Sequence, residues 1–255
     1  MQTASNPCAP KASPPSIDVS SNSESKGCLD CVPAIRDNNE RQGFVRKVYA
    51  LLFIQLGITT ILVAVGVLSE SYRNFVREHQ WLYIVSIVIT AAICIMLICF
   101  YKWFKAVPYN YILLFVFVTA QSYSVSVITS YYEPSSVLIS ASITLAMSFT
   151  LSVYACFTKN DFTKWYSGLF WALLGAFIAS IIFLIFYPSR IILIIITFFV
   201  VVVASIYLIA DTQAIMGGHR YSLSLDDYVL GVILLYTDII MIFVNLLNLI
   251  GKRRS

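Results

Sequence analysis

The chain has 255 residues, of which 59% are hydrophobic and only 12% are charged, and its formal net charge is +4. A mean hydropathy of +0.81 excludes an ordinary soluble domain, and we expect the lipid bilayer, not nucleic acid, to be its main partner. Repeated apolar runs of about 20 residues indicate a protein that crosses the membrane several times.

The first 35 residues are rich in Ser and Pro and too polar to join a hydrophobic core. We therefore predict a disordered cytosolic tail over residues 1–35 and a membrane domain over residues 36–255. Cys28 and Cys31 form a CxxC pair, but no second ligand pair or nearby His completes a zinc site, which favours reduced thiols. The tail also lacks the apolar core of a secretory signal, so the first span is expected to direct insertion.

Seven apolar runs follow the tail, and each is long enough to cross a bilayer. They cover residues 48–68, 81–101, 109–130, 136–157, 166–187, 191–216 and 225–250. A charged loop is expected between the first two runs. A capping box from Ser224 to Asp227, together with the Gly217-Gly218 break, predicts the start of the last helix. The fold class is therefore an all-α membrane protein, a bundle of seven transmembrane helices.

The distribution of Lys and Arg predicts the orientation. With the N-terminus in the cytosol, the cytosolic segments hold 11 of these residues and the opposite side holds 6, as the positive-inside rule favours. Half of the contrary charges are Lys252, Arg253 and Arg254, which would obey the rule better if the last segment turned back. The length and the capping signals of this last segment nevertheless favour a full crossing of the membrane.

Two acidic residues, Asp211 and Asp238, lie deep inside the apolar runs, whereas Asp226 and Asp227 lie at the very start of the last one. A charge at that depth costs a few kcal/mol, so such residues normally face the protein interior or a wet path for ions or protons. Gly231, Asp238 and Asn245 share one face of the last helix, which makes that face polar. The alternative is that Asp238 is a buried, hydrogen-bonded carboxyl that only fixes helix packing.

If the two aspartates meet, desolvation and mutual repulsion disfavour double ionisation, and we expect one shared proton and two separate titration steps. The protonated pair would join two helices, and the deprotonated pair would repel and could coordinate calcium. Helix lengths place the two carboxyls about 12 Å apart in depth, which tilt or an asymmetric loop must remove. The predicted pH gate and calcium ligands are Asp211 and Asp238, with Thr212, Gln213, Tyr236 and Asn245 as pathway or neighbouring residues.

Four segments carry a family resemblance: FVRKVYALLFIQLGITT (44–60), TKNDFT (158–163), IADTQ (209–213) and LSLDDYVLGVILLYTDIIMIFVNLL (223–247). Over residues 36–250 the chain resembles the transmembrane Bax-inhibitor-motif family, nearest its Lifeguard and Golgi anti-apoptotic branches. The resemblance implies a central last helix, a pH-sensitive calcium leak from intracellular stores and suppression of cell death. Calcium would be a transported ion, no cofactor is expected, and the implied location is the Golgi or endoplasmic reticulum membrane.

The chain departs from the family pattern in two places. Bacterial relatives latch the paired aspartates with an arginine on the second span, whereas residues 81–101 contain none. Ser136, with Glu133 nearby, stands where the family has an acid at the start of the fourth span. The resemblance therefore does not identify the residues that hold the paired aspartates in the closed state of this chain.

Two other functions fit these features. A non-conducting scaffold that regulates cell-death partners agrees with the family equally well. An intramembrane aspartyl protease also uses two aspartates, but such proteases resemble Tyr-Asp and Gly-x-Gly-Asp, whereas here Asp211 follows Ala210 and Asp238 follows Thr237. No hydrolase or nucleotide-binding motif is present, so we expect no enzymatic activity.

Overall fold

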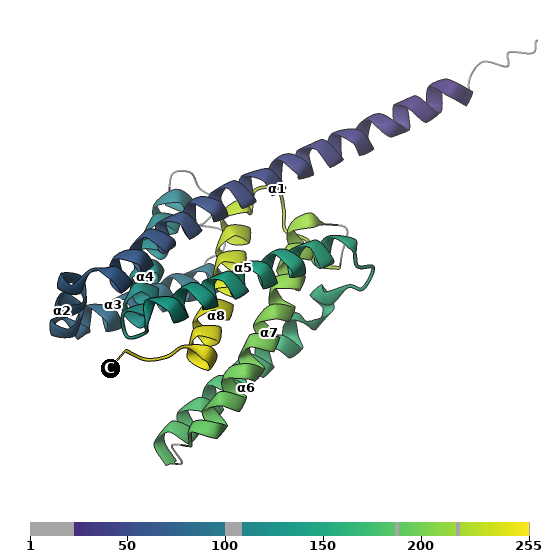
Figure 1. The fold of residues 1–255 in the computed structure, drawn as a ribbon. Helices are drawn as coiled ribbons and strands as arrows, with labels where there is room; N and C mark the ends of the chain where they lie inside the picture. The colour runs from purple at the N-terminus through teal and green to yellow at the C-terminus, as the bar shows by residue number, and fades with distance from the viewer. Residues whose placement is uncertain (1–22, 100–108, 187–188, 218–219, 255) are drawn as a thin grey trace, which may run out of the picture. The chain divides into compact units, whose positions relative to one another are not determined.

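The computed structural model describes residues 23–99, 109–186, 189–217 and 220–254, which are largely helical (Figure 1). The elements are α1 (Ser23–Leu68), α2 (Glu70–Glu78), α3 (Gln80–Cys99), α4 (Tyr109–Ser130), α5 (Pro134–Phe157), the 3₁₀ helix η2 (Phe162–Trp165), α6 (Tyr166–Phe186), α7 (Arg190–Met216) and α8 (Tyr228–Ile250). In these ranges seven helices are long and apolar enough to cross a membrane. The predicted all-α membrane bundle is confirmed.

The bundle is formed by residues 40–255, and the chain before Glu40 makes a separate unit. Residues 1–22 of the predicted tail lie outside the described residues, and α1 begins at Ser23, inside that predicted tail. The disordered, cytosolic character of the tail stays a prediction. The predicted ends of the second and fifth spans, Tyr101 and Tyr187, also fall outside the described ranges.

The loop predicted between the first two spans is in fact the helix α2. Ser69 caps it by accepting a hydrogen bond from the Tyr72 N–H at 3.3 Å. Val76 is only 1% exposed and anchors the helix to the bundle. A loop was predicted because this segment is rich in charged residues. That reasoning overlooked the N-cap Ser69 and the buried Val76, which together favour a helix.

The capping box predicted for the last helix is also wrong. The Ser224 hydroxyl donates to the Asp227 carboxylate at 2.5 Å, and the Asp227 N–H donates to the Ser224 carbonyl, so both residues form a turn. Asp227 is therefore the residue before the helix, and α8 begins at Tyr228 instead of Leu225.

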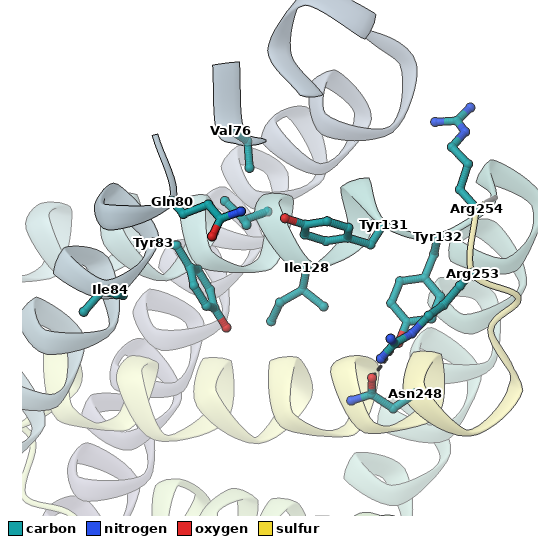
Figure 2. Close-up of a pocket in the computed structure, with 11 residues that line it drawn as sticks. Val76, Gln80, Tyr83, Ile84, Ile128, Tyr131, Tyr132, Asn248, Arg253 and Arg254 are labelled. Carbon is teal, nitrogen blue, oxygen red and sulfur yellow. Dashed lines mark hydrogen bonds between the residues drawn. The ribbon is translucent and has the colours of Figure 1, made fainter. Parts of the chain in front are cut away.

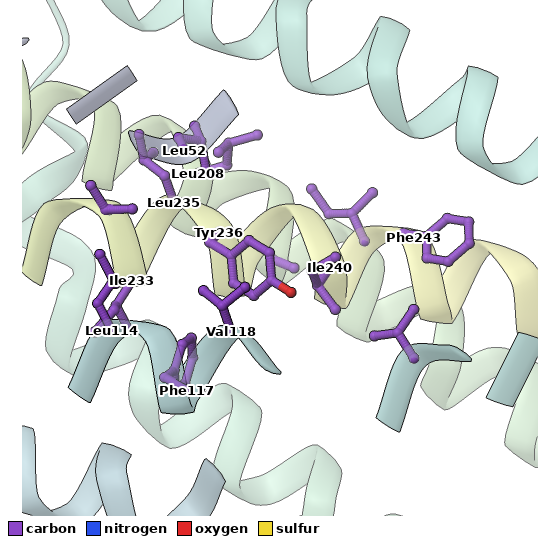
Figure 3. Close-up of a cluster of buried hydrophobic side chains, with 14 of the residues drawn as sticks. Leu52, Leu114, Phe117, Val118, Leu208, Ile233, Leu235, Tyr236, Ile240 and Phe243 are labelled. Carbon is purple, nitrogen blue, oxygen red and sulfur yellow. The ribbon is translucent and has the colours of Figure 1, made fainter. Parts of the chain in front are cut away.

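Helix α8 is the central helix of the bundle, as expected. Its apolar window is 56% buried, the largest share among the seven spans in the described residues, whereas that of the α6 span is 11% buried. It contacts α4, α5 and α7. Figure 3 shows Tyr236 among the buried side chains around it, with its ring edge-on to Phe117 at 6.0 Å between ring centres.

The two ends of α8 are tied to the two ends of the first span. Arg41, near the start of that span, donates to the Leu223 carbonyl at 2.6 Å, just before α8. Arg254, beyond α8, donates to the Val67 carbonyl at 3.3 Å, at the end of α1. Helix α8 therefore crosses the full depth of the bundle in the same direction as α1 and does not turn back.

Residues 251–254 after α8 pair with the short turn between α4 and α5. The Glu133 N–H donates to the Lys252 carbonyl at 3.0 Å, and the Arg254 N–H donates to the Tyr131 carbonyl at 2.9 Å. Lys252 also forms an ion pair with Glu133 at 2.9 Å. The basic C-terminal segment is therefore part of the folded bundle.

Close approach of α1 and α4 generates a stability prediction. A Cβ at Gly66 would lie 2.5 Å from the Ser126 hydroxyl and 2.8 Å from its carbonyl oxygen, so Gly66→Ala should destabilise the bundle by about 1–3 kcal/mol. At Gly57 a Cβ would meet nothing within 4 Å, and Gly57→Ala should be neutral or stabilising by up to about 1 kcal/mol. Thermal unfolding in one detergent compares the two. A Gly66→Ala protein that melts at or above the wild-type temperature would contradict this packing.

Candidate functional site

The two membrane aspartates meet in the interior of the bundle. The carboxyls of Asp211 on α7 and Asp238 on α8 lie within hydrogen-bonding reach of each other, and the residues are 2% and 5% exposed. The Tyr166 hydroxyl, at the start of α6, donates to Oδ1 of Asp211 at 2.7 Å. Two carboxyls can hydrogen-bond only if one carries a proton, so the geometry suits a pair that shares one.

One oxygen of the pair receives no hydrogen bond from an N–H group or a hydroxyl in the described residues. Oδ2 of Asp238 is buried and has no hydrogen-bond partner in the part of the chain that the structure describes. A buried carboxyl oxygen without a partner is costly, and water or a cation commonly satisfies such an atom. The proton shared with Asp211, a water or a cation would satisfy this oxygen.

The loop between α7 and α8 brings the aspartates to nearly the same depth. Helix α7 ends at Gly217, whose φ of +79° is a conformation that favours glycine. The chain then folds back, and the Leu223 N–H donates to the Ala214 carbonyl at 3.0 Å. The loop is thus asymmetric and rejoins the last turn of α7 before α8 begins.

Gly231 fixes the register of the two helices. It faces Ile215, since a Cβ at Gly231 would lie 3.3 Å from Cγ1 of Ile215. Because the two helices run in opposite directions, Asp211, four residues before Ile215, and Asp238, seven residues after Gly231, lie on the same side of this level. At about 1.5 Å per residue, their depths differ by three residues, or about 5 Å. The predicted offset of about 12 Å was too large because α8 begins later than expected and beside the end of α7.

The TKNDFT segment joins the α5–α6 loop to the α7–α8 loop. Asp161 Oδ1 accepts hydrogen bonds from the Thr163 N–H at 3.1 Å and from the Thr163 hydroxyl at 2.6 Å. Asp161 Oδ2 accepts from the Arg220 N–H at 3.3 Å. The Thr163 hydroxyl, the Arg220 N–H and the Lys164 charge hold the pKa of Asp161 below its ordinary value.

Gln213, predicted as a pathway or neighbouring residue, anchors the same loop. It is fully buried, its Oε1 accepts from the Phe162 N–H at 2.9 Å, and its Nε2 donates to the Asn160 carbonyl at 2.8 Å. Gln213 lies two residues after Asp211 on α7. The loop is therefore held directly over the end of the helix that carries the aspartate.

The other predicted neighbours make their described contacts elsewhere. Thr212 donates to the Leu208 carbonyl of its own helix at 2.7 Å, and Asn245 donates to the Met241 carbonyl of its own helix at 2.8 Å. The Tyr236 hydroxyl bonds with Thr59 at 2.8 Å on α1. None of these bonds reaches the carboxyl pair, so their place in a pathway stays a prediction.

The sequence analysis missed three residues, Tyr166, Arg41 and Gln55. Nothing in the local pattern ties Tyr166 to Asp211, although it is the donor where the resemblance implied an arginine, and the described residues of α3 contain no arginine. Arg41 donates to the Ala214 carbonyl at 2.8 Å and so supports the end of α7. Gln55 could have been found, because an amide inside an apolar run is a signal of the same kind as the aspartates.

The donor set does not form a resident metal site. Within the described ranges, no cluster of three or more His, Cys, Asp or Glu side chains could hold a metal ion. Calcium takes about 6–8 oxygen ligands, and two carboxylates supply at most four. Calcium binding by Asp211 and Asp238 therefore stays a prediction, and it would be transient, completed by water or carbonyls.

Comparison with known proteins gives consistent matches. Residues 41–255 match the family model described as Inhibitor of apoptosis-promoting Bax1. The chain is 32% identical over 221 residues to protein lifeguard 3 of Homo sapiens, covering 85% of this chain and 71% of that protein. It is also 32% identical over 208 residues to protein lifeguard 4 of Mus musculus, covering 82% of this chain and 84% of that protein. The family match begins at Arg41 and includes both membrane aspartates.

Asp161 generates a pH prediction for the loops. Because its folded pKa lies below the ordinary 3.8, its carboxylate stabilises the loops above that pH, and this stabilisation is lost as pH falls through the folded pKa. Asp161→Asn should make the Arg220 and Thr163 amides exchange several-fold faster at neutral pH. Hydrogen–deuterium exchange checks this, with Asp226→Asn, at an exposed position of the neighbouring loop, as the control. Unchanged protection in Asp161→Asn would show that its carboxylate does not hold the loops.

Proposed function

Because this chain belongs to the Bax inhibitor family, we propose that it suppresses apoptosis from an intracellular membrane and conducts a pH-sensitive calcium leak. The single observation that carries the channel part is the buried contact between Asp211 and Asp238. The family supports the anti-apoptotic part and cell-death regulators as partners. The proposed location is the Golgi or endoplasmic reticulum membrane, with the N-terminus in the cytosol.

The pair acts as the gate in this proposal. With its proton, the Asp211–Asp238 contact joins α7 to α8, and the Tyr166 hydroxyl adds α6. Without the proton, two carboxylates face each other where the dielectric constant is low, and their repulsion favours separation of the helices. The same carboxylates then attract a divalent cation. Flux should therefore be low while the proton is held and should rise when it is lost.

Buried polar atoms support a wet route through the bundle. The two polar atoms of the Gln55 amide and the hydroxyls of Ser140 and Ser148 are buried without a hydrogen-bond partner in the described ranges. Such atoms are almost always satisfied, by water where the protein provides no partner. They belong to α1 and α5, which both lie beside α8. An interior that holds water at these atoms could carry an ion without large desolvation.

The same helices also line a cavity, most of whose walls are apolar. It has a volume of about 240 Å³ and lies between α1, α5 and α8, with Thr59 and Thr144 in its lining. One end of the α1–α5 contact approaches the gate, because the Tyr49 hydroxyl lies against Ser152 and Thr212, and Thr212 follows Asp211. We place the ion route along this contact, from the cavity to the carboxyl pair.

The decisive experiment measures calcium flux through the purified chain in liposomes across pH. Asp238→Asn keeps the shape and a hydrogen-bonding group but removes the charge and the titration, so flux should stay low and lose its pH dependence. Asp211→Asn should do the same. Because the two residues act as one unit, the double variant should match a single variant, with a coupling of about 0.5–3 kcal/mol.

Asp226→Asn is the matched control, since it makes the same chemical change on an exposed loop residue and should leave the flux unchanged. Tyr166→Phe should shift the pH response without abolishing it, because the carboxyl pair remains. Additive effects of the two aspartates, or a pH response that survives in Asp238→Asn, would remove the pair from the gate. No flux at any pH in the wild-type protein would favour the non-conducting scaffold.

A further inference from the structure

Two cavities, each of about 680 Å³, adjoin at the face of the bundle where α8 ends. Tyr132, Asn248 and Arg253 line both cavities, so Arg253 stands between them. Figure 2 shows the first cavity, with Arg253 extending beside Tyr132 towards Asn248, and Tyr83 on the other side. Sites for small ligands commonly measure roughly 300–1,000 Å³, so each cavity is large enough for one.

The lining of these cavities is basic and contains no acidic residue. Its four cations are Arg190, Lys252, Arg253 and Arg254. The Glu133 carboxylate pairs with Lys252, and Arg254 donates to the Val67 carbonyl. For Arg190 and Arg253, no hydrogen bond or ion pair joins the side chain to another residue in the ranges that the structure describes. Two guanidinium groups are thus available to an anion.

The position of Arg190 strengthens this conclusion. Arg190 is the first residue of α7, and the preceding Ser189 provides no side-chain cap. The N-terminus of a helix carries a partial positive charge and unpaired N–H groups, which favour an anion and disfavour a cation. A basic residue there is favourable if a bound anion lies between it and the helix end.

Much of the remaining lining is apolar and opens towards the side of the bundle. Ile84 on α3 is 62% exposed and Ile194 on α7 is 45% exposed, and both helices are membrane spans. Tyr83 and Tyr131 also line the first cavity, and tyrosine is enriched where a span meets water. The site therefore combines basic groups with apolar walls that face lipid.

We propose that this face binds the headgroup of an anionic phospholipid, with its phosphate between Arg253 and Arg190 and its acyl chains along α7 or α3. Basic pockets between membrane helices on the cytoplasmic side hold such headgroups, and the same basic and apolar chemistry is present at this face. A soluble phosphate would use the guanidinium groups but not the apolar walls. The proposal is independent of the calcium leak.

Native mass spectrometry of the full chain in detergent tests this, with phosphatidylglycerol and phosphatidylcholine of identical acyl chains as probes. Phosphatidylglycerol should bind the wild-type protein more tightly than phosphatidylcholine. Arg253→Gln and Arg190→Gln should each weaken phosphatidylglycerol about fivefold, because one basic residue near a membrane surface contributes about that factor. Binding of phosphatidylcholine should not change.

Arg77→Gln is the matched control, since Arg77 is an exposed arginine on α2 that lines neither cavity. Arg253→Lys should keep most of the phosphatidylglycerol binding, which separates loss of charge from misfolding, and melting temperatures verify the fold. Three results would overturn the proposal. They are no preference for phosphatidylglycerol, an equal loss of binding in Arg77→Gln, or displacement of bound phosphatidylglycerol by millimolar inorganic phosphate as effectively as by added phosphatidylglycerol.

Discussion

The contact between Asp211 and Asp238 constrains how the seven helices are arranged. Ionisable groups at bilayer depth must be enclosed by protein, and this accounts for the central place of α8 and its large buried share. Helix α7 is divided accordingly. Its buried side chains all lie from Val201 onwards, around Asp211, whereas several residues of its first half, such as Ile191 and Ile195, are well exposed. One helix can thus face lipid over half its length and hold a carboxyl in the interior over the other half.

The bonds at the two ends of the bundle determine which motions can open the site. At one end, Asp161 and Gln213 hold the α5–α6 loop against the end of α7, and Arg41 bonds both Ala214 and Leu223. At the other end, residues 251–254 pair with the α4–α5 turn. Because both ends of α8 are pinned, loss of a shared proton in the proposed gate would part the middle of α8 from the last turns of α7, around Asp211, and would not expel α8. Such local separation suits a leak better than a large rearrangement of the bundle.

Sequence reasoning recovered the spans and the two acids because both signals are strong. A run of about 20 apolar residues has few alternatives to a membrane helix, and an Asp within it is conspicuous. The donor Tyr166 was missed because a tyrosine at a span end has many ordinary roles. The depth of the pair was misjudged because it depends on where α8 starts, and a Ser-to-Asp bond in a turn has the same spacing as a capping box. Contacts set by long-range packing, such as Arg41 with Leu223, have no local signature at all.

The C-terminal charges that opposed the orientation rule now have a structural explanation. The rule counts basic residues that hold a loop on the cytosolic side. Here Lys252 is neutralised by Glu133, and Arg254 bonds the end of α1, so neither acts as a simple loop charge. If Arg253 binds an anionic headgroup, its charge is balanced as well. The same segment that runs against the charge rule is the part of the chain that ties the end of α8 to the α4–α5 turn and to the end of α1.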